Sequence, residues 1–296
     1  MPRRRLFRVK LPSSTLVLGK RTLIMGVLNV TPDSFSDGGK FFNLKRALEG
    51  ALAMESAGAD ILDIGAESTR PGSTGISAAE ELQRLLPVLE TLRPRLKIPI
   101  SVDTQKASVA EIALGAGASL LNDISGLKND PRMAQVAARF RAPLILMHMR
   151  GTPRTMQKQP FAKNVLQDVI AGLRRSVAIA RRFGVRKSQI ILDPGIGFGK
   201  SFRQNYELLA GLPQLARLGC PLLVGTSRKG FLGATLASHG KPAPPEARMW
   251  GTAATVTASI LGGVHIVRVH DVAEMAQVAK VTDALLDFAR HSTKRR

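Results

Sequence analysis

The chain has 296 residues, 44% of them hydrophobic, so it is long enough to bury a large core in a single domain. Its 43 lysines and arginines outnumber its 22 aspartates and glutamates, and the resulting net charge of +21 favours anionic partners. The single cysteine, Cys220, excludes an intramolecular disulfide and suits a reducing compartment, so we expect a cytoplasmic protein.

The first 21 residues are basic and are predicted to form an N-terminal arm or an edge hairpin. Lys20 and Arg21 interrupt the apolar stretch that follows the basic start, so neither a signal peptide nor a membrane span is expected. One domain is predicted over residues 22–292, because no break in composition divides it, and residues 293–296 form a basic tail.

Eight short apolar runs follow the arm, and each ends in polar residues. Their β-branched and aliphatic composition predicts buried strands, and apolar residues at helical spacing follow each run. The runs are LIMGVLN (23–29), ADILDIGAE (59–67), IPISVDT (98–104), SLLND (119–123), APLILMHM (142–149), QIILD (189–193), PLLVGTSRK (221–229) and GVHIVRVHD (263–271). The predicted helices are Asn43–Gly58, Ala78–Leu92, Lys106–Gly115, Pro131–Arg141, Phe161–Phe183, Tyr206–Leu218, Ala247–Leu261 and Val272–Arg290.

Eight alternating strands and helices imply parallel strands that are covered on both faces. The count favours an α/β fold of the (β/α)8 TIM barrel type, and an open doubly wound sheet is the alternative. In a barrel the polar ends of all the strands converge on one mouth, which is where the active sites of barrel enzymes lie.

The strand ends and the loops after them carry a set of motifs that resembles the bacterial dihydropteroate synthases. The motifs are LNVTPDSFSDGG (28–39), DIGAESTRPG (63–72), SVDT (101–104), NDISG (122–126), LMHM (146–149), LDPGIGFGK (192–200), GTSRK (225–229) and RVHD (268–271). The resemblance covers about residues 23–290. It implies an enzyme of folate biosynthesis that joins 6-hydroxymethyl-7,8-dihydropterin pyrophosphate to 4-aminobenzoate and releases pyrophosphate with the assistance of Mg²⁺.

Three strand ends carry the groups needed to bind a pterin ring, whose guanidine-like edge presents N–H donors beside a carbonyl acceptor. Asp193 can accept two parallel hydrogen bonds, Asn122 can donate and accept, and Lys229 can donate to a ring atom. The resemblance adds Asp103 to this polar floor and Met147 against the pterin face. Any single Asp or Asn could instead cap the next helix, and Met147 could simply fill the core.

The last strand carries a candidate anion clamp for the pyrophosphate. Arg268 and His270 are two residues apart, so they share one face of the strand, and barrels often bind phosphate after strands seven and eight. The resemblance adds Thr69 and Arg70 to the pyrophosphate site. No serine, cysteine or histidine nucleophile is required. No dedicated general base is expected either, because the arylamine is uncharged at neutral pH. The residues expected to act in catalysis are Asp103, Lys229, Arg268 and His270.

Two further residues at strand ends are ambiguous. By resemblance Asn29 contributes an oxygen ligand to Mg²⁺, which keeps the rest of its shell from water and pyrophosphate. A structural asparagine at the start of a turn is the alternative. His148 could be an interior histidine or a ligand, and we assign it no role.

Two polar, glycine-containing loops, TPDSFSDGG (31–39) and ESTRPGSTG (67–75), are candidate lids at the mouth, although both could be ordinary flexible turns. By resemblance they close over the pyrophosphate and complete the aminobenzoate pocket. The residues expected in that pocket are Phe35, Ser68, Thr69, Pro71, Phe198 and Lys229.

One position departs from the family pattern, and one helix face suggests self-association. Gly230 stands where many members have a hydroxyl or a charged side chain, which leaves only a backbone N–H for the aminobenzoate carboxylate. A small-residue face on the seventh predicted helix suits a homodimer, and packing against a neighbouring barrel helix is the alternative. Its members are Gly251, Thr252, Ala253, Ala254 and Ala258.

The high positive charge does not by itself predict nucleic-acid binding. The basic residues are spread along the chain without interleaved aromatic residues, so a solvated basic exterior is expected, without membrane or nucleic-acid partners. Examples are Arg3, Arg4, Arg5, Arg174, Arg175, Arg181, Arg182, Lys294, Arg295 and Arg296. Two other functions are considered: a methyltetrahydrofolate-binding methyltransferase domain, and a non-catalytic polyanion-binding barrel.

Overall fold

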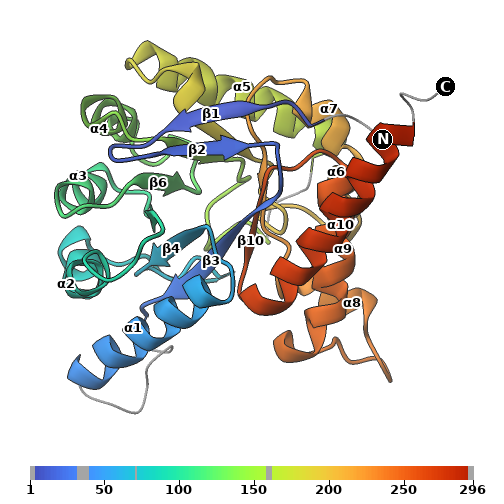
Figure 1. Cartoon of the computed structure of the whole chain (residues 1–296), viewed down its shortest axis with the longest axis horizontal. Coiled ribbons are helices and arrows are strands. Elements are labelled where there is room, and N and C mark those ends of the chain that lie inside the picture. Colours follow the sequence, from blue (N-terminus) through green and yellow to red (C-terminus); the bar gives the residue numbers. More distant parts are fainter. Residues whose placement is uncertain (1–3, 32–39, 71, 158–161, 293–296) are drawn as a thin grey trace.

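The fold is a nearly closed (β/α)8 barrel (Figure 1). The computed structural model describes residues 4–31, 40–70, 72–157 and 162–292. Eight parallel strands hydrogen-bond in the order β8-β7-β6-β5-β4-β3-β10-β9, and a parallel bridge between Leu192 and Leu222 joins the two ends. The predicted TIM barrel is confirmed. The strands are β3 (Leu23–Asn29), β4 (Ile61–Gly65), β5 (Ile100–Asp103), β6 (Leu120–Asp123), β7 (Leu144–Met147), β8 (Ile190–Asp193), β9 (Leu223–Val224) and β10 (Ile266–Val269).

The strand register brings the polar strand ends together. Asn29 pairs with Gly65, Gly65 with Asp103, and Asp103 with Asn122. Farther round the sheet, Met147 of β7 pairs with Asp193 of β8. Because all the strands are parallel, these carboxyl ends lie at one mouth of the barrel, which is the arrangement the sequence predicts.

Helices surround the sheet and bury the outward-facing strand residues in one large apolar core (Figure 1). The helices are α1 (Lys40–Ser56), α2 (Ala78–Leu92), α3 (Ala107–Gly115), α4 (Arg132–Phe140), α5 (Val165–Arg182), α6 (Phe202–Ala210), α7 (Leu212–Ala216), α8 (Gly230–Thr235), α9 (Met249–Leu261) and α10 (Val272–Ser292). Two short 3-10 helices, η2 (Lys187–Gln189) and η3 (Pro245–Arg248), precede β8 and α9.

The predicted and observed bounds of most helices differ by up to three residues, and two helices differ more, for local reasons. Helix α5 begins only at Val165, because the side chain of Asn164 accepts a hydrogen bond from the backbone N–H of Gln167 at 3.1 Å and caps the helix there. The helix predicted over Tyr206–Leu218 is two helices, which meet at Gly211.

The N-terminal arm forms a hairpin that covers the bottom of the barrel. Strands β1 (Phe7–Lys10) and β2 (Thr15–Leu18) pair antiparallel as a separate two-stranded sheet, so the hairpin does not extend an edge of the barrel sheet. In Figure 1 it lies across the near end of the barrel. Its apolar residues form one buried cluster with inward-facing residues of the barrel strands. The cluster comprises Val9, Leu11, Leu16, Leu18, Leu23, Met25, Ile61, Leu120, Ile145, Ile191, Leu223 and Ile266.

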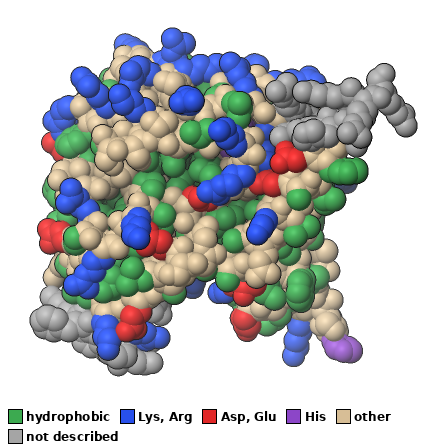
Figure 2. Space-filling model, in the orientation of Figure 1, with side chains coloured by type: hydrophobic (Ala, Val, Ile, Leu, Met, Phe, Trp, Pro, Cys, Tyr) green, Lys and Arg blue, Asp and Glu red, His purple; other side chains and the backbone are tan. Residues whose placement is uncertain are grey.

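Much of the positive charge is exposed on one side of the molecule. Figure 2 shows lysine and arginine side chains gathered along the upper edge, where Figure 1 shows α4, α5 and β1. Arg174, Arg175, Arg181 and Arg182 of α5 are all exposed. The expectation that this face does not contact nucleic acid stays a prediction. No helix in the described part of the chain is long and apolar enough to span a membrane.

Candidate active site

Arg268 lies at the centre of the polar mouth and joins two strand-end carboxylates. Its Nε donates to Asp63 Oδ2 at 2.7 Å, and its Nη2 donates to Asp103 Oδ2 at 2.9 Å. The side chain of Asn122 donates to the same Asp63 oxygen at 3.0 Å. Asp63 is fully buried, and its other oxygen, Oδ1, has no hydrogen-bond partner among the described residues. The carboxylate of Asp63 therefore orients both Arg268 and Asn122.

Burial shifts the ionisation of this cluster. It raises the pKa of Asp103 to about 7, an effect that the charge of Arg268 opposes and that of Asp63 reinforces. Burial also disfavours the charged form of Arg268, but the negative charges of Asp63 and Asp103 outweigh this effect. The pKa of Arg268 therefore lies above its ordinary value. Arg268 therefore stays charged, whereas Asp103 is close to its titration point near neutral pH.

A second group combines an acid, a lysine and an aromatic ring at the ends of β8 and β9. Asp193 Oδ1 accepts the backbone N–H of Gly195 at 2.7 Å. Lys229 Nζ lies 4.0 Å from the centre of the Phe198 ring, which is within cation–π range. A Cβ at residue 197 would come within 3.0 Å of the Lys229 side chain, so Gly197 leaves room for this lysine.

Burial weakens the charged form of both ionisable groups at this place. It lowers the pKa of Lys229 to about 8, although the charge of Asp193 opposes the shift. It raises the pKa of Asp193, against the hydrogen bond from Gly195 and the charge of Lys229. Asp193 and Lys229 are therefore two buried groups of opposite charge, and each can form hydrogen bonds to a heteroaromatic ring.

His270 is held as a neutral imidazole. Its Nδ1 lies 3.0 Å from Ser227 Oγ, which also accepts the backbone N–H of His270 at 3.2 Å. Burial, together with the charge of Arg268, lowers the pKa of His270 to about 4. Next to the charged Arg268, His270 can therefore offer a neutral hydrogen bond to an anion and adds no second positive charge.

Asn29 lies exposed at the end of β3, beside Asp103. A Cβ at Gly65 would lie 3.6 Å from the Asp103 Cβ and 3.8 Å from Asn29 Oδ1, so both side chains border this glycine. Within the described ranges, no three His, Cys, Asp or Glu side chains come together as a metal site. The donor set suits an ion that takes oxygen ligands and keeps most of its shell from water and substrate, as Mg²⁺ does.

Glu67 fixes the loop after β4 through two contacts. Glu67 Oε1 accepts the backbone N–H of Ile76 at 2.9 Å, and Glu67 Oε2 pairs with Lys106 Nζ at 3.0 Å. Within this loop, Ser68 and Thr69 are partly exposed and Arg70 is exposed. The roles predicted for Ser68, Thr69 and Arg70 stay predictions. Phe35, Pro71 and most of the first candidate lid lie outside the described residues.

Met147 is buried in a small apolar cluster at the mouth. The cluster contains Ile124, Met149 and Met156, and Phe198 packs against it. At this position Met147 can serve either as a core residue or as an apolar surface below a bound ring.

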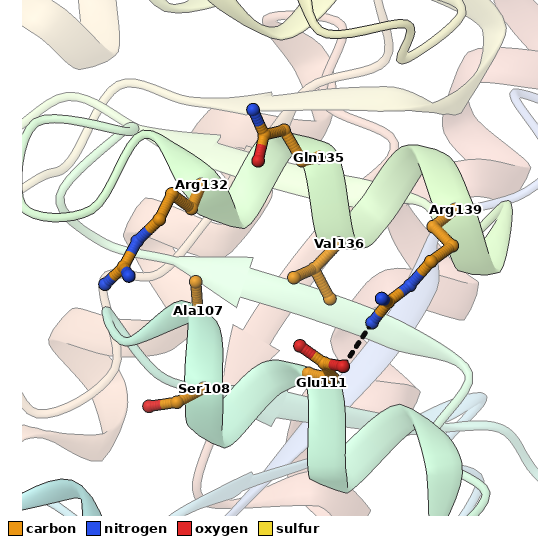
Figure 3. A pocket seen from close by; sticks show the side chains of 7 residues that line it. All are labelled: Ala107, Ser108, Glu111, Arg132, Gln135, Val136 and Arg139. Atoms are coloured by element: carbon orange, nitrogen blue, oxygen red, sulfur yellow. Dashed lines mark ion pairs between the residues drawn. The ribbon is translucent and has the colours of Figure 1, made fainter.

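A shallow depression elsewhere is not part of this mouth. It lies between α3 and α4, has a volume of about 250 Å³, and carries an ion pair between Arg139 and Glu111 (Figure 3). None of the predicted site residues lines it. Its lining residues are Ala107, Ser108, Glu111, Arg132, Gln135, Val136 and Arg139.

Comparisons with known proteins agree with this arrangement. A family model described as pterin binding enzyme matches residues 25–270, and a dihydropteroate synthase from Synechocystis is 53% identical over 90% of this chain and 91% of its own length. The chain belongs to the dihydropteroate synthase family. Among the family's solved structures, the enzyme from Clostridium difficile, in the presence of pteroic acid, is 46% identical, with a TM-score of 0.84 over 90% of this chain and 98% of that one. The enzyme from Xanthomonas albilineans, with 4-aminobenzoic acid, is 39% identical, with a TM-score of 0.87 over 95% of this chain and 99% of that one.

The structure also reveals residues to which sequence reasoning gave no role. Asp63 accepts hydrogen bonds from both Arg268 and Asn122, and Ser227 is hydrogen-bonded to His270. A signal for Asp63 was present, since a lone acid inside an apolar strand needs a partner when it is buried. No comparable signal pointed to Ser227, whose contact with His270 depends on how two neighbouring strands end.

Proposed function

We propose that the protein joins 6-hydroxymethyl-7,8-dihydropterin pyrophosphate to 4-aminobenzoate, giving 7,8-dihydropteroate and pyrophosphate. The observation that carries this proposal is the Arg268 centre, where an anion-binding guanidinium is bonded to Asp103 and, through Asp63, linked to Asn122. The pterin-binding and pyrophosphate-binding groups thus share one site. We expect the protein to act in the cytoplasm.

The pterin would bind in an orientation set by these contacts. Because the Asn122 amide nitrogen already donates to Asp63, its oxygen is left to accept from the ring. Asp193 Oδ1 already accepts from Gly195, so Oδ2 is the oxygen better placed for ring N–H groups, and Lys229 donates to the ring carbonyl or nitrogen. Met147 and its apolar neighbours lie below the ring.

The reaction is a displacement at the pterin methylene. The C–O bond to pyrophosphate breaks, a C–N bond to the arylamine forms, and the amine releases a proton to solvent. Arg268 and neutral His270 stabilise the charge that develops on the leaving group, and the buried walls exclude water. Bound Mg²⁺, for which Asn29 supplies an oxygen, would neutralise part of the pyrophosphate charge.

The aminobenzoate would lie against Phe198 and Lys229, below the loop that carries Ser68 and Thr69. We propose that both lids complete this pocket only over bound pyrophosphate, so that aminobenzoate binds weakly to the free protein. Calorimetric titration of aminobenzoate, with and without pterin and pyrophosphate, tests the order of binding. Tight binding to the free protein would show that the pocket is preformed.

The decisive experiment is a pyrophosphate-release assay in which each substrate is omitted in turn, with the pteridine product identified by mass. Release that needs both substrates and yields 7,8-dihydropteroate supports the proposal. Release without aminobenzoate, or methyl transfer from methyltetrahydrofolate, would contradict it.

We further propose a homodimer that forms through α9 and α10, which pack against each other (Figure 1). Of the small residues on α9, Thr252 is buried against the barrel, whereas Ala254 and Ala258 are exposed. Four large apolar side chains on these helices are more than half exposed, an amount unusual for a monomer. They are Trp250 (75%), Val281 (63%), Leu285 (55%) and Phe288 (76%). Leu285→Glu should halve the mass measured by sedimentation, whereas Leu52→Glu on α1 should not change it.

A further inference from the structure

Lys200 is a buried lysine whose ammonium is held by backbone carbonyls. Only 2% of the residue is exposed. Its Nζ donates to the carbonyl oxygens of His148 at 2.7 Å, Gly195 at 2.8 Å and Pro194 at 3.0 Å. Among the described residues, no carboxylate lies within ion-pair distance of this nitrogen, so three peptide dipoles stabilise its charge.

The three carbonyls belong to two different loops of the mouth. His148 follows β7, whereas Pro194 and Gly195 follow β8. Gly195 has a φ of +68°, and a Cβ there would overlap the His148 carbonyl, so the two loops touch at a position only glycine can occupy. Such an approach directs several carbonyl oxygens into one small space, where they would repel one another without a donor between them. The Lys200 ammonium is that donor.

The neutral imidazole ring of His148 also contacts the Lys200 ammonium. Its Nδ1 lies 3.1 Å from Lys200 Nζ, and its Nε2 lies 3.6 Å from Asp168 Oδ2. Burial, together with the charge of Lys200, lowers the pKa of His148 to about 2. The carboxylate of Asp168 favours the proton on Nε2, which leaves the lone pair of Nδ1 facing the Lys200 ammonium.

The loop held by Lys200 also shapes the site. Gly195 gives its N–H to Asp193 Oδ1 at 2.7 Å, and three residues later Phe198 lies over Lys229. Lys200 itself lies outside the set of groups that face the substrates. A shift of this loop would therefore move the acid that binds the pterin and the aromatic wall of the aminobenzoate pocket together.

We propose that Lys200 is a positioning residue, whose ammonium fastens the loop after β8 to the loop after β7 and so sets Asp193 and Phe198. The role in substrate binding rests on the proposed function, whereas the fastening of the loops does not. Burial lowers the pKa of Lys200 to about 7, although the charge of Asp193 opposes the shift.

Chemical rescue tests the proposal. Lys200→Ala removes a propylammonium group and leaves a space lined by carbonyls. In this variant we expect hydrogen exchange at the Gly195 and Phe198 amides to accelerate at least about tenfold, and kcat/KM to fall roughly ten- to hundredfold, because small misplacements of reacting groups are costly. Added n-propylammonium should reverse both changes, and n-propanol, which has the same shape without the charge, should not.

Two further variants separate fastening from simple packing. Lys200→Met fills the space without donors, so it should show the same loosened loop and should not respond to propylammonium, and it keeps the test available if Lys200→Ala does not fold. Lys128→Met is the matched control, because Lys128 donates to the Met149 carbonyl from an exposed position. Unchanged exchange in Lys200→Met, or equal rescue by propanol, would overturn the proposal. Inactivity of the unmodified protein would contradict the proposed function but leave the exchange result valid.

Discussion

Asp63 and Arg268, 205 residues apart in the chain, form a partly buried ion pair, with Arg268 Nε 2.7 Å from Asp63 Oδ2. No part of the Asp63 side chain is exposed, whereas 23% of the Arg268 side chain is, so solvent screens this pair less than it screens a surface pair. The pair fixes the guanidinium between two acids and, through Asp63, connects it to Asn122, which we propose binds the pterin. Four of the five predictions below concern this centre and the acid of β8.

Asp63→Asn should destabilise the protein by about 3–5 kcal/mol, because it leaves Arg268 with one buried carboxylate fewer. It should also lower kcat/KM, since neither Arg268 nor Asn122 keeps its orientation. Denaturant unfolding and steady-state kinetics measure the two effects. Glu111→Gln, which breaks the exposed pair with Arg139, is the control and should change stability by less than about 1 kcal/mol. If both variants lose the same stability, the ion pair of Asp63 contributes no more than the exposed ion pair of Glu111.

Asp193→Asn should weaken pterin binding by about 2–3 kcal/mol, because one oxygen is replaced by an amide donor that faces the ring donors. The Gly195 N–H already requires the remaining oxygen, so the amide cannot rotate to avoid this conflict. Calorimetry with the pterin measures the loss, and an unchanged affinity would refute this assignment of Asp193.

Arg268→Ala should weaken the pyrophosphate-bearing substrate much more than the pterin alcohol without pyrophosphate, because the guanidinium acts on phosphate oxygens. The variant also leaves Asp63 and Asp103 without their cation, so the comparison of the two ligands must be made on one folded preparation. If both ligands weaken equally, Arg268 supports the fold and not the leaving group.

Gly230→Ser should lower the KM for 4-aminobenzoate about three- to tenfold, because it adds a hydroxyl donor where the chain offers only a backbone N–H. No atom lies within 4 Å of a Cβ placed at this position, so serine fits without strain. Pterin affinity should stay unchanged. If the KM for aminobenzoate does not change, its carboxylate does not lie near residue 230.

The stability of the protein should depend on pH through Asp103. Its pKa is raised by burial to about 7 in the folded state, so between about pH 4 and 7 the folded protein binds more protons than the unfolded chain. This group therefore makes the free energy of unfolding fall as the pH rises through that window. In Asp103→Asn the contribution disappears, and urea unfolding at pH 5, 6 and 7 should show it. If the free energy of unfolding changes with pH in the same way in both proteins, the raised pKa of Asp103 is contradicted.

The barrel and the location of its mouth follow from the order and composition of the strand and helix segments. Apolar runs such as Ile190–Asp193 and Ile266–Val269, each followed by a helix, can bury both faces only in a covered parallel sheet. The carboxyl ends of parallel strands then share one edge whatever the loops do. Asn122, Asp103 and Arg268 were therefore predictable as neighbours from their positions at strand ends.

Which side chains bond to each other depends on how the distant parts of the chain pack. The pairing of Asp63 with Arg268 and the cage around Lys200 depend on strand register and on the close approach of two loops, and both are set by packing across the barrel. The same holds for the hairpin: the sequence predicted an arm or an edge hairpin, but the open bottom of the barrel determined what its apolar residues cover. Local periodicity specifies the elements and their ends, whereas contacts between residues distant in the chain are fixed only when the core closes.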